Sequence, residues 1–342
     1  MSTTRVAING AGRIGRAFLK LALKEVSLDV VAINDLADIE NIAYLMKYDS
    51  AYGKSDLDIK ADKARGVLII NGKEVKYVSE KDPAILPWKD LNVDVVVEST
   101  GLFTSRAKSE AHIKAGAKRV VISAPAKDEA GVPQAATILL GINDERFKDS
   151  PVTSNASCTT NAASPLMAIL DEAIGIEKAL LNTTHGYTAS QSIVDGPSKK
   201  DWKEGRAAAH NIVPTSTGAA IAVTLALPAL AGKFDGISLR VPVIAGSIVD
   251  VTFIAKRNTT VEEVNAALKK AAADPRWKVV FSVTEDPLVS SDIVGSSYAS
   301  IADLGLTRVV DGNLVKVLAW YDNEMGYTHA LVAHVIEAAT YL

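Results

Sequence analysis

The chain has 342 residues, of which 48% are hydrophobic and 23% are charged, and its formal net charge is −3. This length favours about two domains, and the composition is that of an ordinary globular protein with a large core. The charge gives no basic signature for nucleic acid or for a membrane surface. Residues 1–10 lack a signal-sequence pattern, the most apolar stretch (218–232) is too short to span a bilayer, and one cysteine suits a reducing compartment. We therefore expect a cytoplasmic protein.

The N-terminal segment has the pattern strand, glycine turn, helix, strand. Residues 5–9 are a short β-branched run, Gly10-Ala11-Gly12-Arg13-Ile14-Gly15 follows, and a second apolar strand ends in Asn34-Asp35. Such glycines let a pyrophosphate approach the helix N-terminus, and an acid about 20 residues further on accepts hydrogen bonds from a ribose. The pattern predicts dinucleotide binding, with a glycine-rich turn of another α/β protein as the alternative. Because Asp35 repels a 2′-phosphate, NAD is favoured over NADP.

Strands and helices continue to alternate through the first half of the chain. Residues 93–97 form a fully apolar strand, as in a parallel sheet covered on both faces, and the predicted helix 105–115 carries His112 on its surface. Ligands of open parallel sheets lie over the carboxyl edge. The small polar residues at strand ends are therefore cofactor candidates, with plain loop residues as the alternative: Ser99, Thr100, Gly101 and Ser123.

The pattern changes after residue 157. A helix to about residue 174 precedes the strand 179–184, and a long polar loop covers 186–211. Two long strands, 237–243 and 247–255, have no helix between them and indicate an antiparallel sheet. The segment 326–341 is predicted as an amphipathic helix.

Cys158 is the candidate nucleophile. It lies at a helix start, where the macrodipole and free N–H groups favour a thiolate; a buried cysteine acting as a small hydrophobe is the alternative. Of five histidines, His185 is the best partner, because it follows a buried-looking strand and opens a loop. An imidazolium there would lower the thiol pKa, and a neutral ring could take a proton from a hemithioacetal.

Hydroxyl and guanidinium groups near the same elements could bind an anion. For each of them the alternative is a helix cap or a solvated side chain. The candidates are Ser157, Thr159, Thr188, Arg206, Thr217 and Arg240.

Together these residues resemble the phosphorylating glyceraldehyde-3-phosphate dehydrogenase family over nearly the whole chain. The motifs that carry the resemblance are the glycine turn 8–16, Glu98-Ser99-Thr100-Gly101, 122–127, Ser154-Asn155-Ala156-Ser157-Cys158-Thr159-Thr160-Asn161, 215–220 and Trp320-Tyr321-Asp322-Asn323-Glu324. The cysteine segment is highly specific, whereas the glycine turn alone is not. Gly186 departs from the family, which usually has serine or alanine there, and we expect it to add loop mobility.

The resemblance implies a role for each matching residue. Cys158 corresponds to the acylated nucleophile and His185 to its base. Thr188 and Arg240 correspond to the site for the substrate's own phosphate, and Ser157, Thr159, Arg206, Thr217 and Gly218 to the site for inorganic phosphate. The cofactor positions are Asn9, Gly10, Arg13, Ile14, Asp35, Lys81, Ser99, Thr100, Ser123 and Asn323, with Tyr327 near the nicotinamide.

The resemblance also implies the architecture. It is an α/β protein with a Rossmann-type doubly wound parallel sheet domain (1–157) and an α+β catalytic domain with a largely antiparallel sheet (158–321). The C-terminal helix within 322–342 is expected to pack back on the first domain. The loop 186–211 corresponds to the family's interface loop, so a homotetramer is implied. No metal is expected.

Three other functions compete with this one. Erythrose-4-phosphate dehydrogenase shares nucleophile and fold, but the complete Thr215-Ser216-Thr217-Gly218-Ala219-Ala220 segment favours an inorganic phosphate site. Aspartate-semialdehyde dehydrogenase lacks the cysteine segment. A non-enzymatic binder or redox sensor would use the same reactive cysteine, whereas the charge disfavours a dedicated nucleic-acid role.

Overall fold

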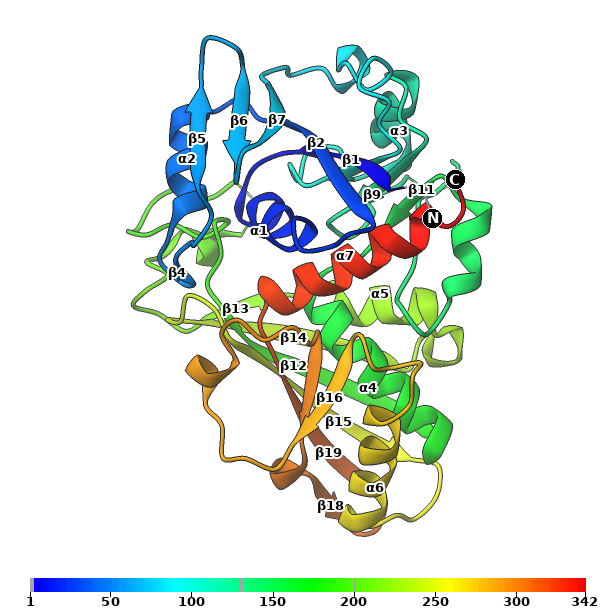
Figure 1. The fold of residues 1–342 in the computed structure, drawn as a ribbon. Helices are drawn as coiled ribbons and strands as arrows, with labels where there is room; N and C mark the ends of the chain where they lie inside the picture. The colour runs from blue at the N-terminus through cyan, green and yellow to red at the C-terminus, as the bar shows by residue number, and fades with distance from the viewer. Residues whose placement is uncertain (1–2, 130–131, 200) are drawn as a thin grey trace. The chain divides into compact units, whose positions relative to one another are not determined.

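The computed structural model describes residues 3–129, 132–199 and 201–342 (Figure 1). The chain splits into two compact units. The first contains Met1–Ile138, Asp144–Ala156 and Leu331–Leu342, and the second contains Leu139–Asn143 and Ser157–Ala330. Within the described ranges, no helix is both long enough and apolar enough to cross a membrane.

The first unit is built on a nine-stranded sheet with the order β10-β11-β9-β8-β1-β2-β7-β6-β5. All neighbours from β10 to β7 pair in parallel, and β6 pairs antiparallel with both β5 and β7. The strands are β1 Thr4–Asn9, β2 Leu28–Asn34, β5 Ile59–Asp62, β6 Val67–Ile70, β7 Lys73–Val78, β8 Val95–Glu98, β9 Arg119–Ile122, β10 Ala136–Thr137 and β11 Val152–Ser154. The small hairpin β3 Tyr48–Asp49 and β4 Gly53–Lys54 lies apart from this sheet. This confirms the doubly wound, mainly parallel sheet.

Helices α1 Arg13–Ala22, α2 Ile39–Lys47 and α3 Arg106–Lys114 belong to the first unit, together with the C-terminal part of α7 Met325–Ala339. Helix α1 starts directly over the glycine turn. Gly10 has a φ of +98°, and a Cβ at Gly15 would lie 2.0 Å from the carbonyl oxygen of Gly10. Only glycines allow the helix to approach the end of β1 this closely.

The second unit contains an eight-stranded sheet with the order β13-β14-β12-β15-β19-β17-β16, and β18 pairs with β19. The strands are β12 Ile176–Gly186, β13 Val213–Ser216, β14 Phe234–Val241, β15 Ser247–Ala255, β16 Phe281–Thr284, β17 Ser300–Asp303, β18 Arg308–Val310 and β19 Leu314–Tyr321. Most neighbours are antiparallel, which confirms the expected sheet. However, β12 lies between β14 and β15, and it is parallel to β14 and antiparallel to β15.

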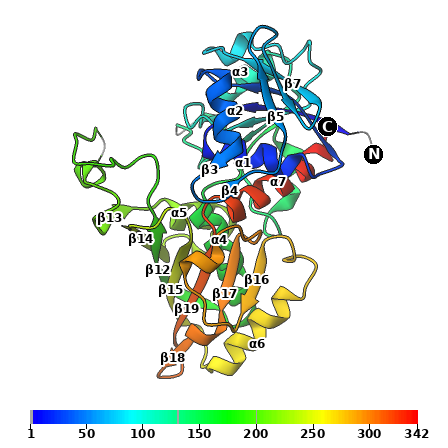
Figure 2. The same ribbon diagram turned by 60° about the vertical axis from the view of Figure 1, so that its left-hand side comes forward.

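One face of this second sheet is covered by helices α4 Cys158–Ala173, α5 Ala219–Ala226 and α6 Val261–Ala272. Buried side chains of the helices and of the central strands form a single core cluster. Strand β15 alternates strictly between buried and half-buried residues, as expected when one face is packed. Figure 2 shows the segment between β12 and β13 extending away from the sheet.

Candidate active site

Cys158 is the first residue of α4, as the sequence predicts. The hydroxyl of the preceding Ser157 caps the helix by accepting a hydrogen bond from the N–H of Thr160 at 3.1 Å. Ala156 has a φ of +54°, a left-handed conformation that costs a residue with a Cβ roughly 1–2 kcal/mol. Cys158 is a partly buried residue that packs against the core of the second unit, so it is not fully enclosed, as the alternative interpretation would require.

The Sγ of Cys158 lies 3.3 Å from the Nε2 of His185. His185 is the penultimate residue of β12, and its ring is buried. Two segments separated by 27 positions in the chain therefore bring a thiol and an imidazole within hydrogen-bond distance. Such a pair is the arrangement that activates a cysteine nucleophile.

The surroundings of the His185 ring disfavour its charged form. Burial, with a further contribution from the positive charge of Arg240, lowers the pKa of His185 to about 3. Burial raises the pKa of the Cys158 thiol, and Arg240 and the hydrogen bonds of Thr159 oppose that shift. Of the two roles considered for the ring, burial and the nearby guanidinium group thus favour that of a neutral base over that of an imidazolium.

The Nδ1 of His185 has two close neighbours. The carbonyl oxygen of Gly186 lies at 2.6 Å, and the Nη1 of Arg240 lies at 2.5 Å. Arg240 reaches the ring because the parallel register of β12 and β14 places it directly opposite His185. The predicted phosphate-binding arginine thus contacts the predicted base.

A hydroxyl that the sequence did not single out for a role connects the elements of the site. The OH of Tyr321, at the end of β19, lies 2.9 Å from the Oγ1 of Thr159 and 2.8 Å from the Oγ1 of Thr183. The Tyr321 ring also packs edge-on against His185, with the two ring centroids 5.9 Å apart. Tyr321 therefore joins α4, β12 and β19 beneath the thiol.

Gly186, which we expected to add loop mobility, is held by a hydrogen bond and by a closely packed backbone. Its N–H donates to the Oγ of Ser247 at 3.1 Å, and that hydroxyl donates to the Oδ1 of Asn323 at 2.9 Å. A Cβ at Gly186 would lie 2.9 Å from the carbonyl oxygen of Val243. Glycine is needed here because a neighbouring backbone approaches closely.

The other candidate anion-binding residues form hydrogen bonds or ion pairs with residues close to them in the sequence. The Thr217 hydroxyl accepts from the N–H of Ala219 at 3.2 Å, so it caps α5, for which Gly218 is the N-cap residue. Thr188 lies 3.1 Å from the hydroxyl of Ser190. Arg206 is exposed and pairs with Asp195 at 2.9 Å. Lys200, in the predicted loop 186–211, lies outside the described residues.

In the first unit, the glycine turn and the acid at the end of β2 lie together. The N–H of Ala11 donates to the carboxylate of Asp35 at 2.7 Å, and the N–H of Ala37 donates to its other oxygen at 2.9 Å. The Ser99 hydroxyl donates to the carbonyl of Gly10 at 2.7 Å. These contacts order the edge where a dinucleotide would bind.

The remaining cofactor candidates occupy varied positions. Arg13, at the start of α1, pairs with Asp49 at 2.8 Å, whereas Lys81 is exposed after β7. Ile14 and Ser123 are half-buried in the first unit, and Asn323 and Tyr327 belong to the second unit.

His112 is buried, which contradicts its predicted place on a surface. The indole N–H of Trp88 donates to its Nδ1 at 3.0 Å, so the ring proton is on Nε2, 3.1 Å from the carboxylate of Glu98. Glu98 also accepts from the side chain of Asn9 at 2.5 Å and from the backbone N–H of Thr100 at 2.9 Å. The buried carboxylate is thus fully hydrogen-bonded beneath the cofactor edge, and the Asn9 side chain is committed to it.

Two family profiles match most of the chain. The profile "Glyceraldehyde 3-phosphate dehydrogenase, NAD binding domain" matches residues 4–106, and "Glyceraldehyde 3-phosphate dehydrogenase, C-terminal domain" matches residues 157–323. The chain is 49% identical over 333 residues to the glyceraldehyde-3-phosphate dehydrogenase of Clostridium acetobutylicum, with 96% of each chain covered. It is 46% identical over 340 residues to that of Geobacillus stearothermophilus, with 99% of this chain and 98% of the relative covered.

The chain belongs to the glyceraldehyde-3-phosphate dehydrogenase family. It is accordingly an NAD-dependent oxidoreductase that acts on the aldehyde of glyceraldehyde 3-phosphate. This confirms the predicted family, activity and cofactor, and the erythrose-4-phosphate alternative is not favoured.

Proposed function

We propose that Cys158 and His185 carry out the phosphorylating oxidation of glyceraldehyde 3-phosphate to 1,3-bisphosphoglycerate. The observation that supports this most directly is the 3.3 Å distance between the Sγ of Cys158 and the Nε2 of His185 at the start of α4. The family match gives the reaction its substrate and its electron acceptor.

In this proposal, His185 takes the thiol proton of Cys158 and the thiolate attacks the aldehyde carbon. The resulting oxyanion recovers that proton from His185 to give a hemithioacetal. The backbone N–H groups at the start of α4 and His185 stabilise the developing oxyanion. His185 then takes the hydroxyl proton as the carbon loses a hydride, which leaves a thioester on Cys158. Inorganic phosphate attacks the thioester, and the released thiolate recovers a proton from His185.

Two sets of residues are proposed to bind the phosphate groups. Thr188 and Arg240 hold the substrate's own phosphate. The buried Nε of Arg240 has no acceptor among the described residues, which leaves a donor for that anion. Inorganic phosphate is assigned to Ser157, Thr159, Arg206, Thr217 and Gly218. Arg206 must exchange Asp195 for the ligand, and the capping hydroxyls keep a further hydrogen-bonding site.

The first unit has the features that NAD requires. The turn is tight at Gly10 and open at Gly12, where an added Cβ would meet no atom within 4 Å. Asp35 is oriented by two backbone N–H groups and retains lone pairs for a ribose. We assign cofactor contacts to this turn, to Arg13, Ile14, Lys81, Ser99, Thr100 and Ser123, to the backbone of Asn9, and to Asn323 and Tyr327. When bound, NAD accepts the hydride.

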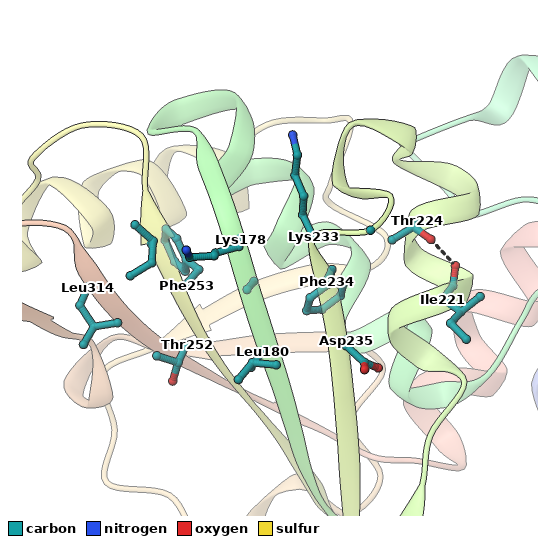
Figure 3. A pocket seen from close by; sticks show the side chains of 13 residues that line it. Lys178, Leu180, Ile221, Thr224, Lys233, Phe234, Asp235, Thr252, Phe253 and Leu314 are labelled. Carbon is teal, nitrogen blue, oxygen red and sulfur yellow. Dashed lines mark hydrogen bonds between the residues drawn. The ribbon is translucent and has the colours of Figure 1, made fainter.

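We also propose that the chain is a cytoplasmic homotetramer. The open face of the second sheet carries a groove of about 770 Å³ (Figure 3). Large apolar side chains are exposed on it and on the adjacent α5, among them Leu180 at 67% and Ile221 at 64%. Exposed apolar surface of this kind is typical of subunit interfaces.

The test is an assay of NAD reduction with glyceraldehyde 3-phosphate and with erythrose 4-phosphate, each with and without inorganic phosphate. We expect rapid, phosphate-dependent turnover of the first aldehyde and its loss in Cys158→Ser. Equal rates with and without phosphate would favour the erythrose-type hydrolysis. Near-normal turnover in Cys158→Ser would refute the nucleophile. Comparing turnover with peroxide inactivation would reveal a sensor role.

A further inference from the structure

A buried carboxylate lies at the point where the strand order of the first sheet reverses. The chain runs from β1 outward to β2 and β7, and then returns to the other side of β1 at β8. Open parallel sheets bind dinucleotides at their carboxyl edge, over such a reversal. Glu98, the last residue of β8, pairs in register with Asn9, the last residue of β1. Glu98 therefore lies at the edge where the cofactor is expected.

The hydrogen bonds of Glu98 are those of an ionised carboxylate. Its Oε1 accepts from the backbone N–H of Thr100 at 2.9 Å and from the Thr100 hydroxyl. Its Oε2 accepts from the side-chain amide of Asn9 at 2.5 Å and from the Nε2 of His112 at 3.1 Å. Each oxygen thus accepts two hydrogen bonds, which is the full capacity of an ionised carboxylate, and a proton on either oxygen would displace a donor.

No cation offsets this charge within the part of the chain that the structure describes. His112 is the one basic side chain there that lies within ion-pair distance of Glu98. Its Nδ1 accepts from the indole N–H of Trp88 at 3.0 Å, so the ring carries its proton on Nε2 alone. Asn9 accepts in turn from the amide of Asn34 at 2.7 Å. The carboxylate is therefore surrounded by neutral donors.

The charge of Glu98 is also poorly screened, because its side chain is buried. An electrostatic interaction is several times stronger at such a position than in bulk water. A ligand that lies over the end of β8 is therefore exposed to the field of this carboxylate, even though its oxygens are fully hydrogen-bonded and make no contact with the ligand.

The proposed placement of NAD brings its nicotinamide half to this position. The adenosine ribose is assigned to Asp35 at the end of β2, and the pyrophosphate to the turn at Gly10 after β1. The rest of the dinucleotide then extends to the other side of β1, over β8. The nicotinamide ring carries a positive charge in NAD⁺ and none in NADH, whereas the remainder of the two molecules is the same. A fixed negative charge here interacts differently with the two.

We propose that the buried carboxylate of Glu98 makes the site bind NAD⁺ more tightly than NADH. The inference rests on the proposed placement of the cofactor. Glu98 attracts the cationic nicotinamide ring, and this attraction is lost when the ring accepts a hydride. The same attraction opposes hydride transfer in the bound state and favours the exchange of NADH for NAD⁺ afterwards. Trp88 and His112 keep the carboxylate hydrogen-bonded without cancelling its charge.

The experiment measures dissociation constants by titration calorimetry on the intact protein freed of cofactor. The ligands are NAD⁺, NADH and ADP-ribose, which lacks the nicotinamide. Glu98→Gln removes the charge and keeps the size of the side chain. The ratio of the NADH constant to the NAD⁺ constant should fall by roughly three- to tenfold, as expected for the loss of one partly screened attraction. The constant for ADP-ribose reports damage that both cofactors share.

Three further variants separate the charge from the hydrogen-bonding geometry. Glu98→Asp keeps the charge and shortens the side chain, so its ratio should stay closer to wild type than that of Glu98→Gln. His112→Gln alters the same hydrogen bonds but leaves the carboxylate, so it should keep the wild-type ratio even if the protein is less stable. Glu74→Gln removes an exposed carboxylate of β7 that pairs with Arg65, and it should leave the ratio unchanged.

Wild-type protein supplies an arm that needs no variant. It should bind NAD⁺ more tightly than NADH, and equal affinities or a preference for NADH would overturn the proposal. The proposal is also overturned if Glu98→Gln keeps the wild-type ratio, or if His112→Gln changes the ratio as much as Glu98→Gln does.

Failure of the proposed function would look different. The titrations contain no aldehyde, so an incorrect assignment of Cys158 and His185 would leave them unchanged. A misplaced cofactor would instead appear as an unchanged affinity for ADP-ribose in Asp35→Ala.

Discussion

The carboxylate of Asp35 accepts a hydrogen bond of 2.7 Å from the backbone N–H of Ala11. This contact ties the acid at the end of β2 to the glycine turn after β1. The contact fixes the acid at the position that we propose for a ribose, where its charge would oppose a 2′-phosphate. The Asp35 carboxylate is therefore expected to favour the binding of NAD and to disfavour the binding of NADP.

Replacing Asp35 with Ala should raise the ratio of NADP to NAD efficiency by about tenfold to a hundredfold, because a repulsion of roughly 1–4 kcal/mol between nearby charges is removed. The measurement is kcat/KM for each cofactor. Asp58→Ala, which alters an exposed pair with Lys60, is the matched control. An unchanged ratio in Asp35→Ala would remove the ribose role.

Replacing His185 with Asn should lower the rate of thioester formation by about 10²–10⁴-fold, the usual contribution of a positioned base. The burst of NADH in the first turnover measures this step. Alkylation of Cys158 by iodoacetamide checks that the nucleophile is still accessible. His210→Asn, on the exposed part of the loop, should retain the wild-type burst. A normal burst in His185→Asn would require another base.

Replacing Gly186 with Ala should destabilise the protein by about 1–3 kcal/mol, because the new Cβ would lie 2.9 Å from a backbone oxygen of Val243. The same shift moves the carbonyl that holds His185, so kcat should fall as well. Chemical denaturation and steady-state kinetics measure the two effects. Gly305→Ala, whose Cβ would lie 3.4 Å from a carboxylate oxygen of Asp303, should be close to neutral. A wild-type free energy of unfolding and a wild-type kcat for Gly186→Ala would show that the backbone around residue 186 can move to accommodate the methyl group.

His334 should make the protein sensitive to mild acid. It is buried in α7, its Nε2 lies 2.8 Å from the Oγ1 of Thr153, and its Nδ1 has no partner among the described residues. Burial lowers its pKa to about 3 from 6.5. Between these values the unfolded chain binds more protons than the folded one, so stability falls as pH drops below about 6.5.

For His334 alone, this amounts to about 2 kcal/mol between pH 7 and pH 5, at about 1.4 kcal/mol per pKa unit. His334→Gln keeps a hydrogen-bonding side chain and removes the titration. Unfolding free energies at the two pH values should therefore differ less in the variant than in wild type. An identical difference in both proteins would contradict the assignment.

The sequence identified the features that depend on neighbours along the chain. The glycine turn, the acid after β2 and the capped cysteine helix each have a local pattern with a physical cause. The sequence also allowed Cys158 and His185 to be predicted as partners, because Cys158 lies at the start of a predicted helix and His185 directly follows a predicted strand. The fold class could be predicted because the strands of the first half are fully apolar, as in a covered parallel sheet, whereas two long strands of the second half follow each other without a helix, as in an antiparallel sheet.

Features that depend on strand register were not predicted. The contact between His185 and Arg240 arises from the pairing of β12 with β14, and no residue spacing reveals it. His112 has a polar environment in the sequence, yet Trp88 and Glu98 enclose it from other elements. The lowered pKa of His185 was not predicted either, since desolvation is a property of packing.

The hydroxyl of Tyr321 is shared by two threonines from different elements of the site. This hydroxyl has a single proton, and it lies within hydrogen-bond distance of Thr159 on the helix of the nucleophile and Thr183 on the strand of the base. Substitutions at these two threonines share that partner, so their effects should not add. We therefore expect substitutions at residues 159, 183 and 321 to be energetically coupled, although these positions lie in three separate stretches of the chain.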